Sequence, residues 1–185
     1  MTTAGTHSMF SDGVFNFIKK RDYALMRRIH HWRAPDWLRW TLVCASRGGD
    51  GWLWYTLGFL LLIFGGRLRF VAVCAGLLAS GVGLTIYEIV KRRTRRMRPC
   101  LVEPNLWARM LPPDQYSFPS GHTIASFAIA TSVGLFYPFL MLVLFCCALL
   151  ISFSRIMLGM HFLSDVVVGM LIGTSLGYAA FWLIR

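Results

Sequence analysis

Acidic residues are scarce in this chain of 185 residues, which carries 8 aspartates and glutamates against 19 lysines and arginines. A site for Mg²⁺ or Ca²⁺ needs several oxygen ligands, and the sequence contains no cluster of carboxylates. The five cysteines have no metal-ligand spacing, and four of them lie in or beside apolar segments. Structural zinc and a framework of disulfide bonds are therefore not expected.

Charge is also missing from four long segments of the chain. Glu88 is the one charged residue in 70–90, and no charged residue occurs in 123–154 or 166–184. A shorter uncharged segment covers 52–66. Uncharged segments of about 20 residues are typical of membrane spans. The sequence therefore predicts an all-α fold, a polytopic transmembrane helical bundle.

The segment 123–154 is too long for one span. As a helix it would be roughly 48 Å long, whereas the hydrocarbon core of a bilayer is about 30 Å thick. Pro138 lies near its middle, where proline would interrupt a helix and favour a turn. We therefore expect five spans in a single domain. Their approximate ranges are 52–66, 70–90, 119–136, 138–160 and 164–184.

The first 51 residues are too polar for the core of a secretory signal and too frequently charged for a span. Basic residues are interleaved with aromatic ones, among them Trp32, Trp37 and Trp40. This mixture is typical of helices that lie among lipid headgroups; a solvated basic tail is the alternative. We divide the chain into an N-terminal interfacial amphipathic segment, 1–51, and a transmembrane domain, 52–185.

Polar residues with chemical potential lie at the edges of the apolar segments. His161 precedes Asp165 by four residues, so on a helix the carboxylate could hold one imidazole nitrogen. A histidine held in this way is suited to act as a nucleophile or base. Arg155 lies six residues before His161, close to two helical turns, and could bring a guanidinium to the same place.

A second group opens the loop after residue 90. Lys91 and Arg98 are seven residues apart, so they would share one face of a helix that Pro99 ends. Basic residues here also suit attraction to anionic lipid headgroups. We favour that interpretation for Arg92, Arg93, Arg95 and Arg96.

A third group closes the same loop. Ser120 is a candidate N-cap, and Gly121 lets a backbone amide approach a ligand closely. The start of a helix suits a phosphate because its N–H groups are unpaired, and His122 would stand at that start. Taken alone, these residues could equally form an ordinary turn and cap.

Together the three groups read Lys-x6-Arg-Pro, Pro-Ser-Gly-His and Ser-Arg-x5-His-x3-Asp. This set resembles the complete signature of the type 2 phosphatidic acid phosphatase (lipid phosphate phosphatase) superfamily. The resemblance covers about 85–185, with a looser likeness in 22–51. Glucose-6-phosphatases and vanadium haloperoxidases have similar sites, so the motifs define the chemistry more narrowly than the substrate.

The resemblance implies a role for each residue. His161 would attack phosphorus and form a phosphohistidine, Asp165 would orient it, and His122 would protonate the leaving group and later activate water. The groups that would hold the phosphoryl oxygens are Lys91, Arg98, Ser120, Gly121 and Arg155. Phosphoryl transfer depends mainly on positioned positive charge, which supports the same assignment. We expect no metal or other cofactor.

Five spans would place all three motifs on one face of the membrane. That face would carry 16 of the 19 basic residues, which the positive-inside rule assigns to the cytoplasm. Most bacterial members of the family are thought to work on the outer face of the inner membrane, often with one further N-terminal span. We expect a multi-pass protein of the inner cell membrane with its site on the N-terminal face, and of the two sides we favour the periplasmic one.

The resulting prediction is a metal-independent phosphatase. It would hydrolyse the phosphomonoester or diphosphate headgroup of phosphatidic acid, phosphatidylglycerol phosphate, an isoprenyl diphosphate or a lipid A phosphate. One alternative is a lipid phosphotransferase that uses the same site. Another is a non-catalytic membrane protein that binds anionic lipids, although binding alone needs no acid–base pair such as His122 and His161. The expected partners are the substrate and anionic membrane lipids, without nucleic acid; the oligomeric state is left open.

Overall fold

The computed structural model describes residues 4–32, 34–102 and 114–185, with side chains from residue 16 onward. In these residues the predicted all-α class is confirmed, and extended backbone pairs only at an isolated bridge between Met97 and Tyr116. The helices are α1 (Ala4–His31), α2 (Asp36–Arg47), η1 (Gly48–Trp52), α3 (Leu53–Phe64), η2 (Gly66–Leu68), α4 (Arg69–Thr94), α5 (Pro99–Val102), α6 (Gly121–Phe136), α7 (Pro138–Met157) and α8 (Leu163–Ile184).

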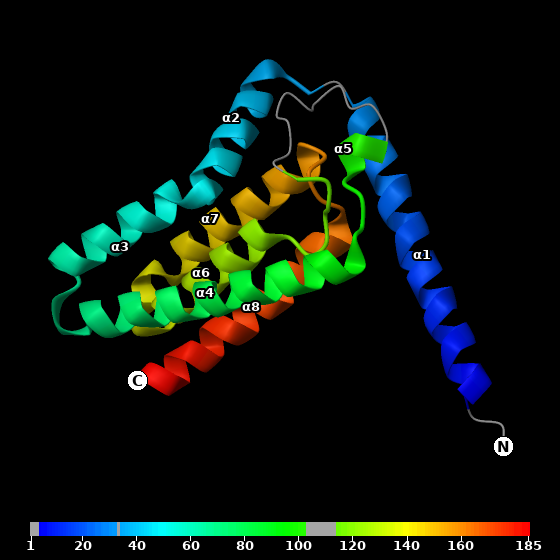
Figure 1. The fold of residues 1–185 in the computed structure, drawn as a ribbon. Helices are drawn as coiled ribbons and strands as arrows, with labels where there is room; N and C mark the ends of the chain where they lie inside the picture. The colour runs from blue at the N-terminus through cyan, green and yellow to red at the C-terminus, as the bar shows by residue number, and fades with distance from the viewer. Residues whose placement is uncertain (1–3, 33, 103–113) are drawn as a thin grey trace.

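Helix α6 lies at the centre of the bundle, with α4, α7 and α8 packed around it (Figure 1). Its sequence is rich in alanine, serine and threonine, and most of its residues are buried. Phe127, Val133 and Phe136 contribute to the main hydrophobic core, which also contains alanines of the neighbouring helices. Small residues let helix backbones approach closely, which is how helices associate inside membranes.

Three glycines of α8 form its contact with α6. They are Gly169, Gly173 and Gly177, at intervals of four residues. A Cβ atom at Gly173 would lie 2.4 Å from the carbonyl oxygen of Ile124, and one at Gly177 would lie 2.5 Å from that of Ala128. The backbones of α6 and α8 therefore touch directly, in the arrangement that small residues at every fourth position permit.

Among the described residues, three helical segments are long and apolar enough to cross a membrane: Gly66–Thr94, Pro138–Met157 and Leu163–Ile184. Helix α6 is apolar but shorter. The predicted break at Tyr137 and Pro138 is confirmed, because α6 ends at Phe136 and α7 begins at Pro138. The count of five spans stays a prediction.

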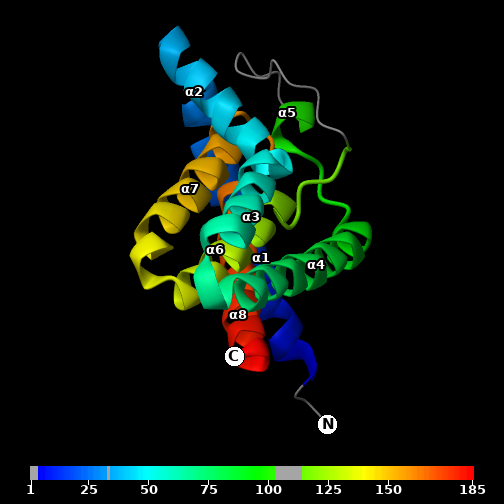
Figure 2. The same cartoon turned by 90° about the vertical axis from the view of Figure 1, so that its left-hand side faces the viewer.

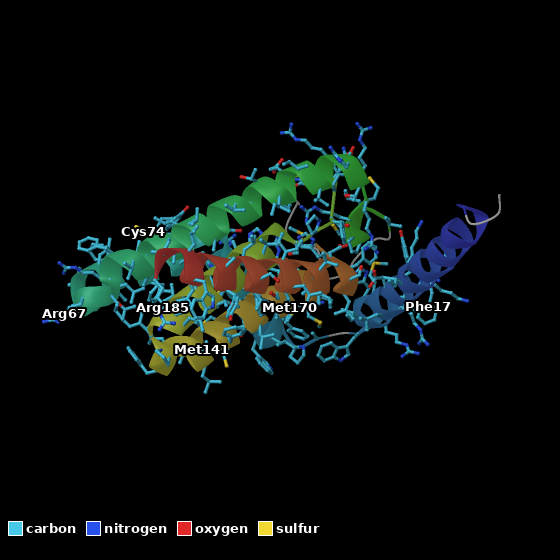
Figure 3. The ribbon with its side chains drawn as sticks, turned by 90° about the horizontal axis from the view of Figure 1, so that it is seen from below. Phe17, Arg67, Cys74, Met141, Met170 and Arg185 are labelled. Atoms are coloured by element: carbon cyan, nitrogen blue, oxygen red, sulfur yellow. The ribbon has the colours of Figure 1, made fainter. Side chains whose placement is uncertain are left out.

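The N-terminal part of the chain forms two helical arms. Helix α1 extends away from the bundle (Figures 1 and 3). Helix α2 packs on α7 and continues through η1 into α3, which lies in front of the bundle between α7 and α4 (Figure 2). The bend between them lies at Gly51, whose φ of 124° favours glycine. The division at 1–51 and 52–185 stays a prediction.

Candidate active site

The three motifs meet at one end of the bundle, where α4 and α7 end and α6 and α8 begin (Figure 1). A cavity of about 350 Å³ lies there. Its polar lining residues include Asp50, Tyr87, Arg98, Asp114, His122, Arg155 and His161, and Gly121 also lines it. Five of the eight predicted site residues thus share one cavity. Lys91 contacts two of the lining residues, whereas Ser120 and Asp165 lie behind the wall.

A pair of short segments holds the site together between α4 and α6. Helix α4 stops where Arg95 adopts a left-handed conformation with φ of 48°. The chain then runs antiparallel to the segment before α6: the amide of Ser117 donates to the carbonyl of Arg96 (2.7 Å), and the amide of Arg98 donates to that of Gln115 (3.1 Å). This pairing delivers the carbonyl oxygen of Ser117 to His161.

His161 is held as a neutral imidazole whose unprotonated nitrogen, Nε2, points toward Arg98. Its Nδ1 lies 2.6 Å from the carbonyl oxygen of Ser117, which can only accept, so Nδ1 carries the proton. Its Nε2 lies 3.3 Å from Nη1 of Arg98, which can only donate, so Nε2 presents its lone pair. Complete burial, together with the positive charges of Arg155 and Arg98, lowers the pKa of His161 well below its ordinary value. The imidazole is therefore uncharged and nucleophilic near neutral pH.

The predicted direct hold of Asp165 on His161 is wrong in its detail. Helix α8 begins at Leu163, so His161 precedes the helix and the two side chains do not stack along one face. Nδ1 of His161 lies 3.9 Å from Oδ2 of Asp165, beyond hydrogen-bond distance. That oxygen instead accepts from the amide of Phe162 (2.8 Å), and Oδ1 accepts from Arg96 (2.7 Å). Asp165 therefore holds the backbone amide of Phe162 and places a negative charge near His161, while the carbonyl of Ser117 sets the tautomer of His161.

The interpretation of Arg96 as a residue that attracts lipid headgroups is wrong, because its side chain is paired inside the protein. Its guanidinium bridges two carboxylates, with 2.7 Å to Asp165 and 2.7 Å to Asp22 of α1. It also lies over the ring of Phe162, with 4.1 Å between Cζ and the ring centroid. Arg96 is therefore part of the support beneath His161.

Arg98 and Arg155 line the cavity and Lys91 lies beside it, but Lys91 and Arg98 are not brought together in the way that helical spacing suggested. Because α4 ends at Thr94, Lys91 and Arg98 do not share a helix face; they meet at the carboxylate of Asp114 instead. Asp114 lies 2.9 Å from Nζ of Lys91 and 3.0 Å from Nη2 of Arg98. Burial alone would raise the pKa of Asp114, but the hydrogen bond from Lys91 and the charge of Arg98 lower it. Asp114 is thus an anion where a phosphate would bind.

The third cation, Arg155, is buried at the end of α7. Its Nη1 donates to the hydroxyl of Ser46 in α2 (2.6 Å). Its Nε is buried and has no hydrogen-bond partner among the described residues. A buried donor of this kind is costly unless a ligand satisfies it. Arg155 therefore offers an unused donor beside the cavity.

The start of α6 is confirmed as the position of the serine–glycine–histidine motif. Ser120 occupies the N-cap position, but its hydroxyl makes no cap bond and accepts from Thr123 instead (3.0 Å). Ser120 is fully buried and does not line the cavity. A Cβ atom at Gly121 would come within 3.2 Å of the Tyr87 ring. The close approach at Gly121 is therefore to Tyr87 as well as to the cavity.

His122 meets a carboxylate that the motifs did not indicate. Its Nε2 lies 2.6 Å from Oδ1 of Asp50, which belongs to η1. Gly49 makes this contact possible, because a Cβ there would lie 2.6 Å from Ile151 and 3.3 Å from the ring of His122. The run Gly48-Gly49-Asp50-Gly51 was the available signal, since glycines beside an aspartate at the edge of an apolar segment indicate close packing.

The cavity has an apolar wall formed by residues of α3, α4 and α6. Trp54, Leu77, Leu84 and Ile129 form this wall. A smaller cavity of about 50 Å³ continues between α3, α4 and α6, sharing Trp54, Leu77 and Ile129 with the first. A ligand with a charged end and an apolar chain matches this division of the lining.

Chemically, the site offers a neutral imidazole with an unprotonated Nε2, a second histidine paired with a carboxylate, and three cations. In the part of the chain that the structure describes, no group of three His, Cys, Asp or Glu residues is placed to hold a metal ion. Besides Asp50, sequence reasoning missed Asp114, Ser46 and the carbonyl of Ser117, whose roles depend on contacts between segments far apart in the chain.

Comparisons with known proteins agree with this geometry. Residues 69–185 match the model of the PAP2 superfamily. The chain is 30% identical over 139 residues to an undecaprenyl-diphosphatase of Sulfolobus acidocaldarius, covering 74% of this chain and 66% of that protein. It is 29% identical over 144 residues to a decaprenylphosphoryl-5-phosphoribose phosphatase of Mycobacterium tuberculosis, covering 74% and 77%.

Solved structures show the same fold. A transmembrane PAP2-type phosphatidylglycerolphosphate phosphatase from Bacillus subtilis superposes with a TM-score of 0.70 at 22% identity, over 91% of this chain and 86% of that one. Aquifex aeolicus LpxE gives 0.68 at 29% identity, over 86% and 93%. The family, the helical membrane fold and the class of activity predicted from the motifs are confirmed by these likenesses to phosphatases of lipid phosphates and diphosphates. This multi-pass helical chain belongs to the PAP2 superfamily.

Proposed function

We propose that the chain hydrolyses the phosphomonoester or diphosphate headgroup of a membrane lipid through a phosphohistidine on Nε2 of His161. The observation that carries this proposal is the unprotonated Nε2 of His161, 3.3 Å from Nη1 of Arg98, in a cavity that Arg155 also lines. The names of the relatives support a lipid substrate of this chemistry. The apolar wall formed by α3, α4 and α6 supports an amphiphile, because it continues from the polar end of the cavity.

In the first step, Nε2 of His161 attacks phosphorus and the bond to the leaving oxygen breaks. His122 gives a proton to that oxygen. Lys91, Arg98 and Arg155 stabilise the negative charge that spreads over the phosphoryl oxygens. Nδ1 keeps its proton toward Ser117, so the phosphorylated ring carries a positive charge, which the carboxylate 3.9 Å away favours.

In the second step, His122 takes a proton from water as the water oxygen attacks phosphorus. The bond between phosphorus and Nε2 breaks, and inorganic phosphate leaves. Burial and the positive charge of Arg155 disfavour the charged form of His122 that the first step needs. The carboxylate of Asp50, 2.6 Å from Nε2 of His122, opposes these effects and stabilises that form.

The test is phosphate release by the purified protein in detergent, with phosphatidic acid, phosphatidylglycerol phosphate, undecaprenyl diphosphate and lipid A as substrates. His161→Ala should abolish release and acid-labile labelling of the protein by a ³²P-labelled donor. Asp36→Asn is the matched control, because the Asp36 side chain is 82% exposed and does not line the active-site cavity. Undiminished release by His161→Ala would refute the proposal, and label transferred to an acceptor lipid rather than to inorganic phosphate would show a phosphotransferase.

We also propose that the site faces the outer side of the inner membrane. Arg67 and Arg185 lie at the end of the bundle opposite α1 (Figure 3), so they report on the other face. In a variant with its five cysteines replaced by serine, Gln115→Cys should react with an impermeant maleimide in intact cells. Arg67→Cys should react only after permeabilisation. The reverse pattern would place the site in the cytoplasm.

A further inference from the structure

Helix α1 lies outside the segment that matches the PAP2 superfamily, yet it reaches the support of the active site. Asp22 of α1 is only 5% exposed. Its Oδ2 accepts from Nη2 of Arg96 (2.7 Å) and from the hydroxyl of Ser164 (2.5 Å), and its Oδ1 accepts from the amide of Ser164 (3.2 Å). A buried carboxylate with this set of donors on other segments is a built contact rather than a surface ion pair.

Arg96 transmits this contact to the catalytic loop. Its Nη2 pairs with Asp22 and its Nη1 pairs with Asp165, so one planar guanidinium spans both carboxylates. Asp165 is fully buried, and Arg96 is the cation paired with it. A buried carboxylate that loses its cation is strongly disfavoured. Asp22 holds the far side of the guanidinium and so keeps it against Asp165.

Asp165 in turn fixes the backbone next to the nucleophile. Its Oδ2 accepts from the amide of Phe162, the residue after His161. The ring of Phe162 is held between α1 and Arg96: Tyr23 lies 5.0 Å from it between centroids, and the guanidinium of Arg96 lies over it. Asp22 thus contacts Arg96, and Tyr23 contacts Phe162. Helix α1 therefore touches two residues that support the loop carrying His161.

We propose that Asp22 is a positioning residue for His161, acting through Arg96 and Asp165, and that α1 is part of the machinery of the reaction. This rests on the proposed role of His161 as nucleophile. A shift of about 1 Å in a reacting group can cost about 100-fold in rate. Asp22→Asn retains the shape and an acceptor oxygen but removes the charge that holds Arg96, so we expect kcat to fall about 10- to 100-fold. The KM should change less than about twofold, because the substitution leaves the three cations of the cavity in place.

The experiment compares the parent with Asp22→Asn, Arg96→Gln and the double variant, each purified in detergent and assayed for phosphate release from phosphatidic acid. Asp36→Asn is the matched control, since the Asp36 side chain is 82% exposed and its carboxylate lies 3.9 Å from the guanidinium of Arg39. Because Asp22 acts through Arg96, the double variant should lose no more than the worse single variant. Active-site titration with the ³²P-labelled donor and thermal unfolding separate a lower kcat from a smaller folded fraction.

Three outcomes overturn the proposal: a kcat of Asp22→Asn within twofold of the parent, losses that multiply in the double variant, or a loss explained wholly by fewer titrated sites. If Asp22→Asn does not fold, Arg96→Gln is judged by the same measurements, and an unchanged kcat there overturns the proposal equally. The parent and His161→Ala are measured together. Release by the parent that His161→Ala retains would refute the proposed function instead, so the two failures are distinct.

Discussion

Replacing Asp165 by asparagine tests how the nucleophile is held. In the structure the tautomer of His161 depends on the carbonyl of Ser117, and Asp165 lies at 3.9 Å. In a serine protease triad, the corresponding change costs about 10⁴ in kcat because the histidine adopts the wrong tautomer. Here a carbonyl can only accept a hydrogen bond, so Asp165→Asn leaves the tautomer unchanged.

What Asp165→Asn removes is the electrostatic part of the interaction. Two unit charges 3.9 Å apart attract by about 4 kcal/mol at an effective dielectric constant of about 20. The guanidinium of Arg96 lies 2.7 Å from the same carboxylate and cancels part of this attraction. Retaining about half gives roughly 2 kcal/mol of stabilisation for the charged phosphohistidine, which corresponds to a loss of about 30-fold in rate.

The assay is rapid-quench measurement of phosphohistidine formation from a ³²P-labelled lipid phosphate, with Asp36→Asn as the control for removal of a carboxylate, because Asp36 is exposed. We expect the rate of formation to fall by about 30-fold while the KM stays within a few-fold of the parent. A loss near 10⁴ would show that Asp165 sets the tautomer and that Ser117 does not. No loss would show that the charge of Asp165 is fully cancelled by Arg96.

Three further predictions follow from other contacts. Gly173→Ala should lower the free energy of unfolding by about 1–3 kcal/mol because its Cβ would meet the backbone of α6. Gly58→Ala should not lower it, because the space around Gly58 is open. Equal stability of the two variants in detergent would contradict the direct backbone contact. Asp114→Asn should strengthen inhibition by inorganic phosphate, since Lys91 and Arg98 lose the carboxylate that pairs with them. A partly exposed ion pair contributes roughly 1 kcal/mol, so the inhibition constant should fall about fivefold. An unchanged or higher inhibition constant would count against this. Because its pKa is lowered, His161 stays neutral in the folded protein below pH 6.5, so the acid limb of kcat/KM should lie below 6.5. The unfolded chain binds that proton more readily, so the free energy of unfolding should decrease as the pH falls below about 6.5, and decrease less in His161→Gln; an acid limb above 6.5 would be inconsistent with a buried neutral imidazole.

Local patterns in the sequence were sufficient for the helical class and for five of the residues that line the cavity. Missing charge identified the apolar helices, and Pro138 correctly divided the longest segment, because proline at the first position of α7 suits a helix start. The motif spacing identified His122, Arg155 and His161, which all line the cavity. These features depend on neighbours within a few residues, where spacing and propensity decide the outcome.

Contacts between distant segments could not be inferred in this way. Lys91 and Arg98 were expected to meet along a helix face, but they meet through Asp114, because Arg95 ends α4 early. Arg96 resembled its basic neighbours in sequence, and only the fold shows its pairing with Asp22, which lies 74 residues away. Asp50 lies outside the motifs and reaches His122 because the chain bends at Gly51.

The glycine contact between α6 and α8 has a geometric consequence for the chemistry. His122 stands at the start of one helix and Asp165 at the start of the other, so sliding these helices by a single residue would change their separation by about 1.5 Å. Gly177 lies roughly 18 Å along α8 from Asp165. Its contact with the backbone of α6 helps to set the axial position of the two helices relative to each other. The separation of His122 and Asp165 is thus set in part by glycines deep in the bundle, and a methyl group added at Gly177 would alter it by meeting the backbone of α6.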